Sequence, residues 1–330
     1  MKSFIFFCSV ILALAGLYGL AFAHSISVVG IKKITAGGKY SIPQWSPDGT
    51  KIYASGPNGE IVVMNADGTN PQALNAGDGL ERRFEISPDG KQILFEYKGA
   101  LWLMNSDGSN QREIVPAKAF QGIWSPDGTR IAYGTGDLWI MNADGSGKTK
   151  LVEYAVPESF SPDGLNILYS SVENNVDGIR SIKLDGTGKN FIVPGVALDG
   201  VVFSPDGSKI YYEGDILYSF DLQSKTETKL TGIISSFSLS PDGSMIAYAY
   251  RLEEEDTAAT TVADIWVMNS DGTGKIQVTN TPDIFEASPR WSPDGKKIVF
   301  SEESSSDLYV ATIAVFSSPR QDAGYLVWFS

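Results

Sequence analysis

Seven aspartates occupy the same place in a repeated tetrapeptide, and they are the first residues in this sequence whose spacing could do chemistry. A ring of carboxylates could bind a cation or supply acids and bases. Each aspartate, however, is the third residue of Ser-Pro-Asp-Gly, where proline presets φ, aspartate bonds the neighbouring backbone and glycine takes a left-handed conformation. A tight turn explains every copy, so we predict a structural role and no site for Asp48, Asp89, Asp127, Asp163, Asp206, Asp242 and Asp294.

A second repeated motif, Asn-x-Asp-Gly, resembles the start of a calcium-binding loop. It occurs at residues 65–68, 105–108, 142–145 and 269–272. None of these copies has the full alternating ligand spacing or the distal bidentate glutamate that a calcium loop requires. We therefore expect no cofactor, and calcium at these turns is the alternative that the sequence leaves open.

The usual nucleophiles and metal ligands are nearly missing from the chain. Cys8 is the single cysteine and His24 the single histidine, and both lie close to the N-terminus. The rest of the chain therefore has no thiol nucleophile, no thiolate metal site and no side chain whose ordinary pKa lies near neutrality. We predict no catalytic residue, and the sequence favours a protein without enzyme activity over an enzyme.

Charged residues outside the repeat are the remaining candidates for binding. The longest insertion, Arg251 to Asp264, carries an acidic run, and basic residues fall in segments that join one repeat to the next. We predict binding roles for Arg82, Arg83, Glu253, Glu254, Glu255, Asp256 and Arg290. We expect Arg290 to lie in a loop at the mouth of a central channel, and a merely solvated loop is the alternative for the acidic run.

The elements that must position these residues can be read from the repeat itself. The tetrapeptide occurs seven times at intervals of 36 to 52 residues, and a period near 40 is the length of a four-stranded propeller blade. After each turn an isoleucine stands at a fixed offset, and an aromatic follows two residues later in six copies, which marks a strand with one buried face. The isoleucines are Ile52, Ile93, Ile131, Ile167, Ile210, Ile246 and Ile298.

This pattern predicts an all-β chain, folded as a β-propeller of seven four-stranded blades. The last repeat lacks an evident fourth strand, and Ile31 to Thr35 looks like a fourth strand without a blade of its own. Pairing the two would close the ring and remove its open edges. Tyr325 to Phe329 is another possible strand. We assign residues 24–316 to the propeller and 317–330 to a C-terminal tail.

The first 23 residues form a segment of a different kind. Lys2 precedes an almost unbroken apolar run from Phe4 to Phe22, and the segment ends in Ala-Phe-Ala. This is the pattern of a signal peptide, so we predict cleavage between Ala23 and His24 and a periplasmic or secreted protein. An uncleaved membrane anchor is the alternative. After cleavage, we expect no membrane span.

The charge balance excludes one class of partner. The chain has 26 Lys and Arg against 39 Asp and Glu, a net charge of −13. Nucleic-acid binding needs clustered basic residues to neutralise phosphates, and here they are scattered. We expect a soluble monomer whose partner is an envelope or extracellular protein or a glycan.

The repeats resemble those of the TolB-like propeller family. The resemblance rests on the aromatic-Ser-Pro-Asp-Gly turn, the Ile-x-aromatic strand and the hairpin from Asp264 to Thr273, and it extends from about Ile31 to Val315. It implies a WD40-like propeller of the cell envelope. TolB itself carries an α/β domain ahead of its propeller, whereas few residues here precede the first turn, so we expect a relative rather than TolB.

Two classes of function fit these features. The first is an exported, non-catalytic binding or scaffold protein that presents its loops for recognition, which fits the lack of an acid–base constellation. The second is a carbohydrate-active enzyme, a polysaccharide lyase or hydrolase on a propeller scaffold. The first is our main expectation because a histidine is the commonest proton-transfer residue near neutral pH. The propeller of a peptidase is a third class, which we expect to fail because no α/β-hydrolase domain follows in the sequence.

Overall fold

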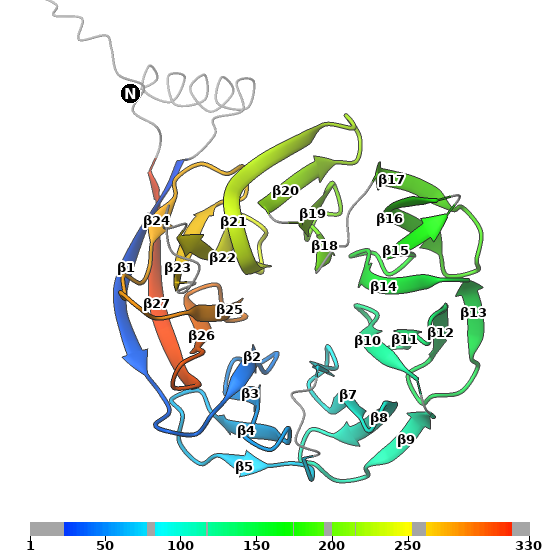
Figure 1. The fold of residues 1–330 in the computed structure, drawn as a ribbon, viewed down its shortest axis with the longest axis horizontal. Helices are drawn as coiled ribbons and strands as arrows, with labels where there is room; N and C mark the ends of the chain where they lie inside the picture. Colours follow the sequence, from blue (N-terminus) through cyan, green and yellow to red (C-terminus); the bar gives the residue numbers. More distant parts are fainter. Residues whose placement is uncertain are drawn as a thin grey trace, which may run out of the picture.

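The computed structural model is an all-β ring of sheets. It describes residues 23–318 apart from 78–82, 117, 174, 195–199, 215 and 253–261. Its strands form six hydrogen-bonded sheets, five of four strands and one of seven. Figure 1 shows the sheets arranged around a central axis, with β2, β10, β14, β18 and β25 towards the axis and β1, β5, β9, β13 and β17 on the outside. No helix among the described residues is long and apolar enough to cross a membrane.

In each of the first four sheets the strands follow one another in chain order from the axis outwards. The first sheet consists of β2 (Ser41–Trp45), β3 (Lys51–Ser55), β4 (Ile61–Asn65) and β5 (Gln72–Ala73). The second consists of β6 (Phe84–Ile86), β7 (Gln92–Tyr97), β8 (Ala100–Asn105) and β9 (Arg112–Val115). The third consists of β10 (Phe120–Trp124), β11 (Arg130–Gly134), β12 (Leu138–Asn142) and β13 (Thr149–Val152). The fourth is β14 (Ala155–Phe160), β15 (Asn166–Glu173), β16 (Val176–Lys183) and β17 (Asn190–Pro194).

The seven-stranded sheet contains two four-stranded blades that share one long strand. Its strands are β18 (Val201–Phe203), β19 (Lys209–Glu213), β20 (Ile216–Asp221), β21 (Glu227–Leu239), β22 (Met245–Leu252), β23 (Val262–Asn269) and β24 (Ile276–Gln277). The sequence predicts a loop between these two blades, but β21 runs through both. The β-branched residues Thr231, Ile233 and Ile234 favour an extended backbone there, and no proline interrupts it.

Hydrophobic clusters fill the spaces between neighbouring sheets. One cluster joins Leu94 and Leu101 of one sheet to Ile131 and Tyr133 of the next. The seven isoleucines that follow the turns are all fully buried, at 0% exposure. Burying a side chain of this size contributes roughly 1.5–3 kcal/mol to folding. The isoleucine pattern is therefore the sequence signature of the packing between sheets.

The Ser-Pro-Asp-Gly turns have one geometry throughout. In every copy the serine hydroxyl donates to the aspartate Oδ1 at 2.5–2.7 Å, and each turn glycine has a φ of 68–72°. Ser125 Oγ, for example, also accepts the Arg130 N–H at 2.9 Å. The hydrogen bond from Ser125 holds the pKa of Asp127 below its ordinary value. The hydrogen bonds within the turn thus explain why the same position is an aspartate in every copy.

The Asn-x-Asp-Gly turns use their aspartates in the same way. Asp67 Oδ1 accepts the Thr69 N–H at 3.0 Å and the Thr69 hydroxyl at 2.6 Å. The same pair of bonds forms between Asp107 and Ser109. These carboxylates are therefore occupied by their own turns, and calcium at these positions stays a prediction.

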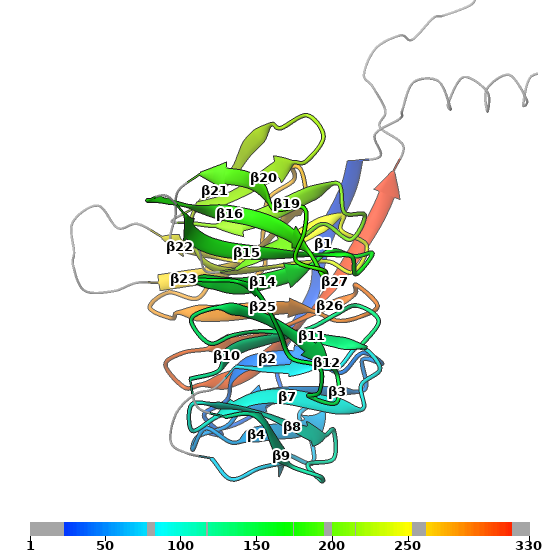
Figure 2. The ribbon, with the colours of Figure 1, turned by 90° about the vertical axis from the view of Figure 1, so that its right-hand side faces the viewer.

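The N-terminal strand closes the ring, as the sequence predicts. β1 (Ala23–Lys33) pairs antiparallel with β27 (Asp307–Ser318), which continues the sheet through β26 (Lys297–Glu302) to β25 (Glu286–Trp291). Lys33 Nζ lies 2.7 Å from Asp307 Oδ2, and the Thr35 hydroxyl donates to Asp307 Oδ1 at 3.0 Å. Figure 2 shows β1 and β27 extending together past the rest of the ring. The paired strands thus reach from Ala23 to Ser318, slightly beyond the predicted propeller limits.

Candidate functional site

One position of the repeat differs in nearly every copy, and it lies at the end of each innermost strand. It directly precedes the apolar residue that stands before the turn. Its occupants are Gln44, Glu85, Ile123, Ser159, Val202, Ser238 and Arg290. Two of them are charged, Glu85 in β6 and Arg290 in β25. β6 and β25 are end strands of their sheets, and Figure 1 shows β25 on the side of its sheet that faces the axis. Glu85 and Arg290 are close enough for each to shift the pKa of the other.

Glu85 is the most perturbed carboxyl group at this centre. Its side chain is exposed to solvent and lines a cavity whose walls come from several strands. Desolvation by the surrounding protein atoms raises its pKa to about 7, and the positive charges of Arg290 and Arg83 oppose this shift. Glu85 therefore exchanges a proton near neutral pH, which a glutamate with an ordinary pKa does not.

Arg290 is the cationic counterpart of Glu85. Its guanidinium donates to the backbone carbonyls of Phe237 and Pro289, each at 3.2 Å. Desolvation lowers its pKa, Arg83 lowers it further, and the carboxylates of Glu85 and Glu213 oppose the change. Two guanidinium groups and two carboxylates thus interact electrostatically, and we call Arg83, Glu85, Glu213 and Arg290 the axial charge cluster.

The place of Arg290 corrects one sequence-based expectation. We expected it in a loop at the channel mouth, on the side away from the turns. It instead belongs to β25 and immediately precedes Trp291, so it lies at the end of the strand that leads into a turn. Trp291 packs in a hydrophobic cluster that includes Ala249 and Ile265 of the neighbouring sheet, so this segment is part of the packed ring and is not a loop.

Hydrogen bonds between neighbouring sheets fix the backbone of both charged residues. The indole N–H of Trp124 donates to the Glu85 carbonyl at 3.4 Å, and that of Trp45 donates to the Arg290 carbonyl at 3.1 Å. The Gln44 amide donates to the Phe84 carbonyl at 2.7 Å. The cluster is therefore held by rigid strands of the ring, which is what preorganised chemistry requires.

A cavity of about 130 Å³, the axial pocket, adjoins Glu85. Four innermost strands contribute to its walls, and its polar side chains are Arg83, Glu85, Glu96, Gln121 and Glu158. Glu158 accepts a hydrogen bond from the Ser170 hydroxyl at 2.7 Å, and Glu96 accepts one from the Gln121 N–H at 2.7 Å. Glu85 and Glu158 are thus two carboxyl groups in different environments that face one small cavity.

Gln121 stands in the axial pocket in a strained conformation. Its φ is +50°, in the left-handed region that residues other than glycine rarely adopt. The pairing of β10 with β11 shifts register at this point, between Phe120 and Ile123. The same bulge recurs in β2 at Ile42 and in β25 at Ser288, so it is a feature of the innermost strands. Here the bulge turns the Gln121 N–H towards Glu96.

The other predicted binding residues divide into two groups. Arg82 and the acidic run Glu253, Glu254, Glu255 and Asp256 lie outside the described residues. Arg83 is described and belongs to the axial charge cluster together with Arg290. The structure thus brings together two of the predicted arginines, and it adds Glu85, which the sequence analysis did not select.

Two buried carboxyl groups lie in the last two sheets, near the insertion that contains the acidic run. Asp264 accepts hydrogen bonds from the Gln277 amide at 2.8 Å and the Thr281 N–H at 3.1 Å. Glu286 accepts one from the Thr281 hydroxyl at 3.1 Å and another from Thr279. Burial raises the pKa of Glu286, although these hydrogen bonds oppose the shift. Both groups are satisfied by protein partners.

The described part of the chain contains no group of three or more His, Cys, Asp or Glu side chains placed to hold a metal ion.

Solved structures with this architecture include enzymes. No protein-family model matches the chain. An oligogalacturonate lyase in complex with manganese matches with a TM-score of 0.66 and 16% identity, covering 89% of this chain and 96% of the lyase. An oligogalacturonate lyase from Vibrio parahaemolyticus matches with a TM-score of 0.66 and 13% identity, over 88% of this chain and 97% of that one.

TolB structures are also similar, with lower scores. A putative TolB from Agrobacterium tumefaciens has a TM-score of 0.51 and 18% identity over 90% of this chain and the whole of that chain. TolB from Acinetobacter baumannii has a TM-score of 0.50 and 15% identity, covering 88% of this chain and 79% of that one. At these identities the comparisons show the propeller fold, which the sequence predicts.

One curated protein shares a short stretch of sequence. Dipeptidyl-peptidase 5 of Porphyromonas gingivalis is 37% identical over 67 residues. The stretch is 20% of this chain and 10% of the peptidase, so the chain matches only a small part of that protein.

The comparisons correct our main expectation about function. We expected a non-catalytic binding or scaffold protein, but the solved structures with the higher TM-scores are lyases, which are enzymes. The result favours the alternative of a carbohydrate-active enzyme on a propeller. The expectation rested on the lack of a histidine with a pKa near neutrality, and the structure adds Glu85, whose pKa desolvation raises to about 7.

Proposed function

We propose that this protein is an exported carbohydrate-active enzyme, a lyase that cleaves uronate-containing oligosaccharides by β-elimination at the axial pocket. The observation that carries the proposal is Glu85, a carboxyl group that titrates at about pH 7 beside two guanidinium groups. A group with this pKa serves best as an acid or base near neutral pH. The match to lyase structures over most of the chain supports the reaction class.

The proposed reaction needs a base and a cation in fixed positions. In β-elimination, a base removes the proton on the carbon next to the uronate carboxylate, the bond to the neighbouring glycosidic oxygen breaks, and a carbon–carbon double bond forms. The ionised Glu85 would accept this proton. The departing oxygen takes a proton from the protein or from water, so no oxidant or co-reactant is needed.

The two arginines would make the proton removable. Negative charge spreads onto the uronate carboxylate as its neighbouring C–H bond breaks, and a guanidinium that pairs with the carboxylate stabilises that charge. Arg290 and Arg83 are both close enough to Glu85 to shift its pKa. Arg290 is held by two backbone carbonyls, so its charge is in place before substrate binds.

The size of the axial pocket limits the substrate. At about 130 Å³ it is smaller than the roughly 300–1,000 Å³ of typical small-molecule sites. It would therefore hold one end of a saccharide rather than the middle of a polymer. We infer a preference for short oligosaccharides, attacked at a terminal unit.

Neither manganese nor any other metal enters this proposal. One of the similar lyases was solved with manganese, but the described residues of this chain offer no set of donors that would hold a metal ion. In this protein, Arg83 and Arg290 would supply the positive charge. We derive no step through a metal.

Export and family relationship are part of the same proposal. The Lys2 n-region, the apolar run and the Ala-Phe-Ala ending support a signal peptide and a location in the periplasm or outside the cell. The Ser-Pro-Asp-Gly repeats support a relative of the TolB-like propellers, distinct from TolB. A glycan would then be its partner in that compartment.

The direct test is incubation of the purified protein with oligogalacturonate and with other uronate oligosaccharides. We expect ultraviolet absorbance from the conjugated double bond to rise together with new reducing ends. New reducing ends without absorbance would mean hydrolysis and would overturn the reaction type. If no uronate oligosaccharide is cleaved while a control lyase cleaves it, the proposed function is wrong.

A further inference from the structure

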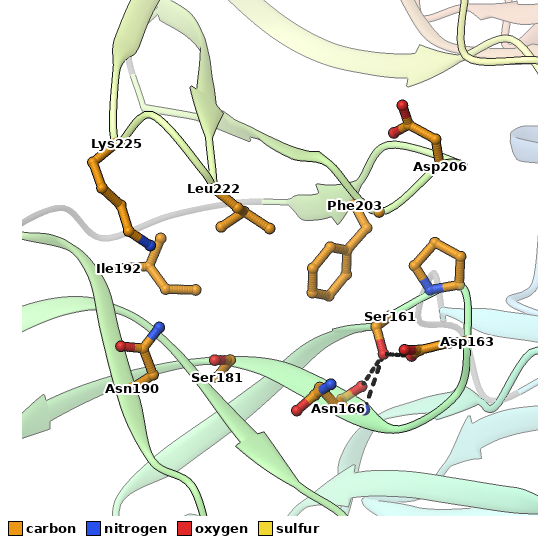
Figure 3. A pocket seen from close by; sticks show the side chains of 12 residues that line it. Ser161, Asp163, Asn166, Ser181, Asn190, Ile192, Phe203, Asp206, Leu222 and Lys225 are labelled. Atoms are coloured by element: carbon orange, nitrogen blue, oxygen red, sulfur yellow. Dashed lines mark hydrogen bonds between the residues drawn. The ribbon is translucent and has the colours of Figure 1, made fainter.

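A second cavity opens between the β14–β17 sheet and the β18–β21 strands, on the side of the Ser-Pro-Asp-Gly turns. Its volume is about 350 Å³, which lies within the range of small-molecule sites. Figure 3 shows the side chains that line it. Residues of two neighbouring turns, Asp163 and Asp206, stand at one end, and Lys225 stands at the other (Figure 3). We call this cavity the interblade pocket.

A departure from the repeat opens the interblade pocket. The third strand of each blade has an equivalent position, which lies two residues before the Asn-x-Asp-Gly turn where that turn is present. Five blades carry an apolar side chain at this position: Val63, Leu103, Ile140, Val267 and Val310. The corresponding residues of the other two blades are Ser181 and Ser219. Ser219 is buried at 5% exposure, but Ser181 lines the cavity. Packing alone would favour an apolar residue at position 181.

One wall of the interblade pocket is polar and lacks protein partners. Asn166 of β15, Ser181 of β16 and Asn190 of β17 lie on consecutive strands of one sheet, which are roughly 4.8 Å apart. Among the described residues, none of these three side chains has a hydrogen-bond partner. These side chains are partly or fully exposed, so their donors and acceptors are available to a ligand, and a row of amides and a hydroxyl suits a ligand with several hydroxyl groups.

The opposite wall is apolar and centred on an aromatic ring. Phe203 and Leu222 form it, and Ile192 lies beside Lys225 (Figure 3). The face of an aromatic ring is negatively polarised, and it attracts the C–H bonds on one face of a sugar ring. A ligand with hydroxyl groups along its edge and C–H bonds on its face fits both walls. A pyranose unit has this character.

The charges of the interblade pocket orient such a ligand. Lys225 forms no ion pair with any described residue, and its side chain extends towards Ile192 and Asn190 (Figure 3). At the other end, Asp163 accepts from Ser161 Oγ and Leu165 N, and Asp206 accepts from Ser204 Oγ, so both carboxylates remain ionised within their turns. An anionic group is therefore attracted to the Lys225 end and repelled from the other.

We propose that the interblade pocket is a second saccharide-binding site, which holds one uronate unit with its carboxylate at Lys225 and one sugar face on Phe203. The choice of a uronate rests on the proposed function, whereas the two walls and the lysine are independent of it. The site would be non-catalytic, because it lacks a carboxyl group with a raised pKa among its lining residues. It would retain the oligosaccharide near the enzyme between turnovers.

The test is an NMR titration with a galacturonate trisaccharide, using protein labelled at the isoleucine methyl groups and inactivated by Glu85→Gln. Ile192 lines the interblade pocket, so its methyl signal should shift with a saturable, millimolar dependence. Ser181→Leu restores the apolar residue of the repeat and should abolish the shift. Lys225→Ala should weaken binding about two- to fivefold, whereas Lys183→Ala, which removes an exposed lysine outside the lining residues, should leave it unchanged.

Each result decides a different question. If the Ile192 signal does not move, or moves equally in the Glu85→Gln parent and in its Lys225→Ala and Ser181→Leu derivatives, the second site is wrong even where protein with Glu85 intact cleaves uronates. If Lys225→Ala removes binding but no substrate is cleaved by protein with Glu85 intact, the second site stands and the proposed function fails. Should Ser181→Leu not fold, Asn190→Ala and Lys225→Ala carry the test. A neutral trisaccharide that binds as tightly as the uronate would overturn the role of Lys225.

Discussion

The seven Ser-Pro-Asp-Gly turns and the strand ends that precede them are neighbours in every repeat, but they differ in how freely their residues vary. The turns are identical in sequence and share one geometry. Two residues before each turn serine, the strand end carries glutamine, glutamate, isoleucine, serine, valine, serine and arginine in the successive repeats. Repetition thus marks what the ring needs to fold, and departure from it marks where chemistry is possible.

The largest difference between the strand ends and the turns should appear when an acidic residue of each is replaced by its amide. Glu85→Gln keeps the shape of the side chain but removes its proton transfer, so we expect a loss of about 10²–10⁴-fold in kcat for uronate cleavage. Asp127→Asn makes the same change in a turn and should leave kcat within about twofold. Absorbance assays of both proteins, with melting temperatures as the folding control, decide the matter. Equal losses in the two variants would mean that Glu85 has no special role.

A smaller effect is expected at the cationic strand end. Arg290→Gln removes the charge that we place against the substrate carboxylate, and this should lower kcat/KM by about 10–100-fold. Arg290→Lys should recover part of the loss, because it restores the charge without the planar geometry. Steady-state kinetics with uronate and neutral substrates measure both effects. A variant that binds and cleaves uronates normally would exclude Arg290 from the site.

The raised pKa of Glu85 also predicts how stability depends on pH. Its pKa is about 7 in the folded protein and near its ordinary value of 4.5 in the unfolded chain, so the folded state binds more protons between these limits. The free energy of unfolding should therefore fall as the pH rises from about 4.5 to about 7, and this contribution should be constant above that. Thermal melts of Glu85→Gln should lack this component. An identical pH profile in wild type and variant would contradict the raised pKa.

The smallest effect is expected within the turns, and it has the opposite pH dependence. Asp127→Ala removes the acceptor for Ser125 Oγ and the Thr129 N–H, which should cost about 1 kcal/mol of stability. Because the pKa of Asp127 is lowered in the folded protein, its contribution is present at neutral pH and lost as the pH falls below about 4. Urea titrations at pH 7 and pH 3 measure the difference. A variant as stable as wild type at pH 7 would show that the turn does not need its aspartate.

Much of the fold could be predicted because the same strand-and-turn pattern occurs seven times in the sequence. The buried isoleucines and the pairing of Ile31 with the last blade follow from sequence periodicity and from the need to close an open edge. The continuous strand β21 was missed, because the repeat suggested a loop where β-branched residues extend the strand.

The candidate site was harder to predict, because its properties belong to the ring and not to a local motif. Glu85 resembles any surface glutamate in the sequence, and the desolvation that raises its pKa arises only in the folded ring, where it lines a cavity with residues of several strands. Ser181 is equally inconspicuous until it is aligned with the apolar residues of other repeats. A search for charged or small residues at positions that are apolar or variable among repeats could have found both.

The pairing of β1 with β27 has a consequence for the order of folding. Lys33 pairs with Tyr309, so the ring closes between residues near the two ends of the chain, whereas every other sheet pairs strands that are close in sequence. Local hairpins form quickly, and contacts between distant residues pay a larger entropy of loop closure. The pairing of β1 with β27 should therefore be the last step of folding. Until it forms, the edge of β27 is free to pair with another chain. A nascent molecule remains an open arc until its final strand is made.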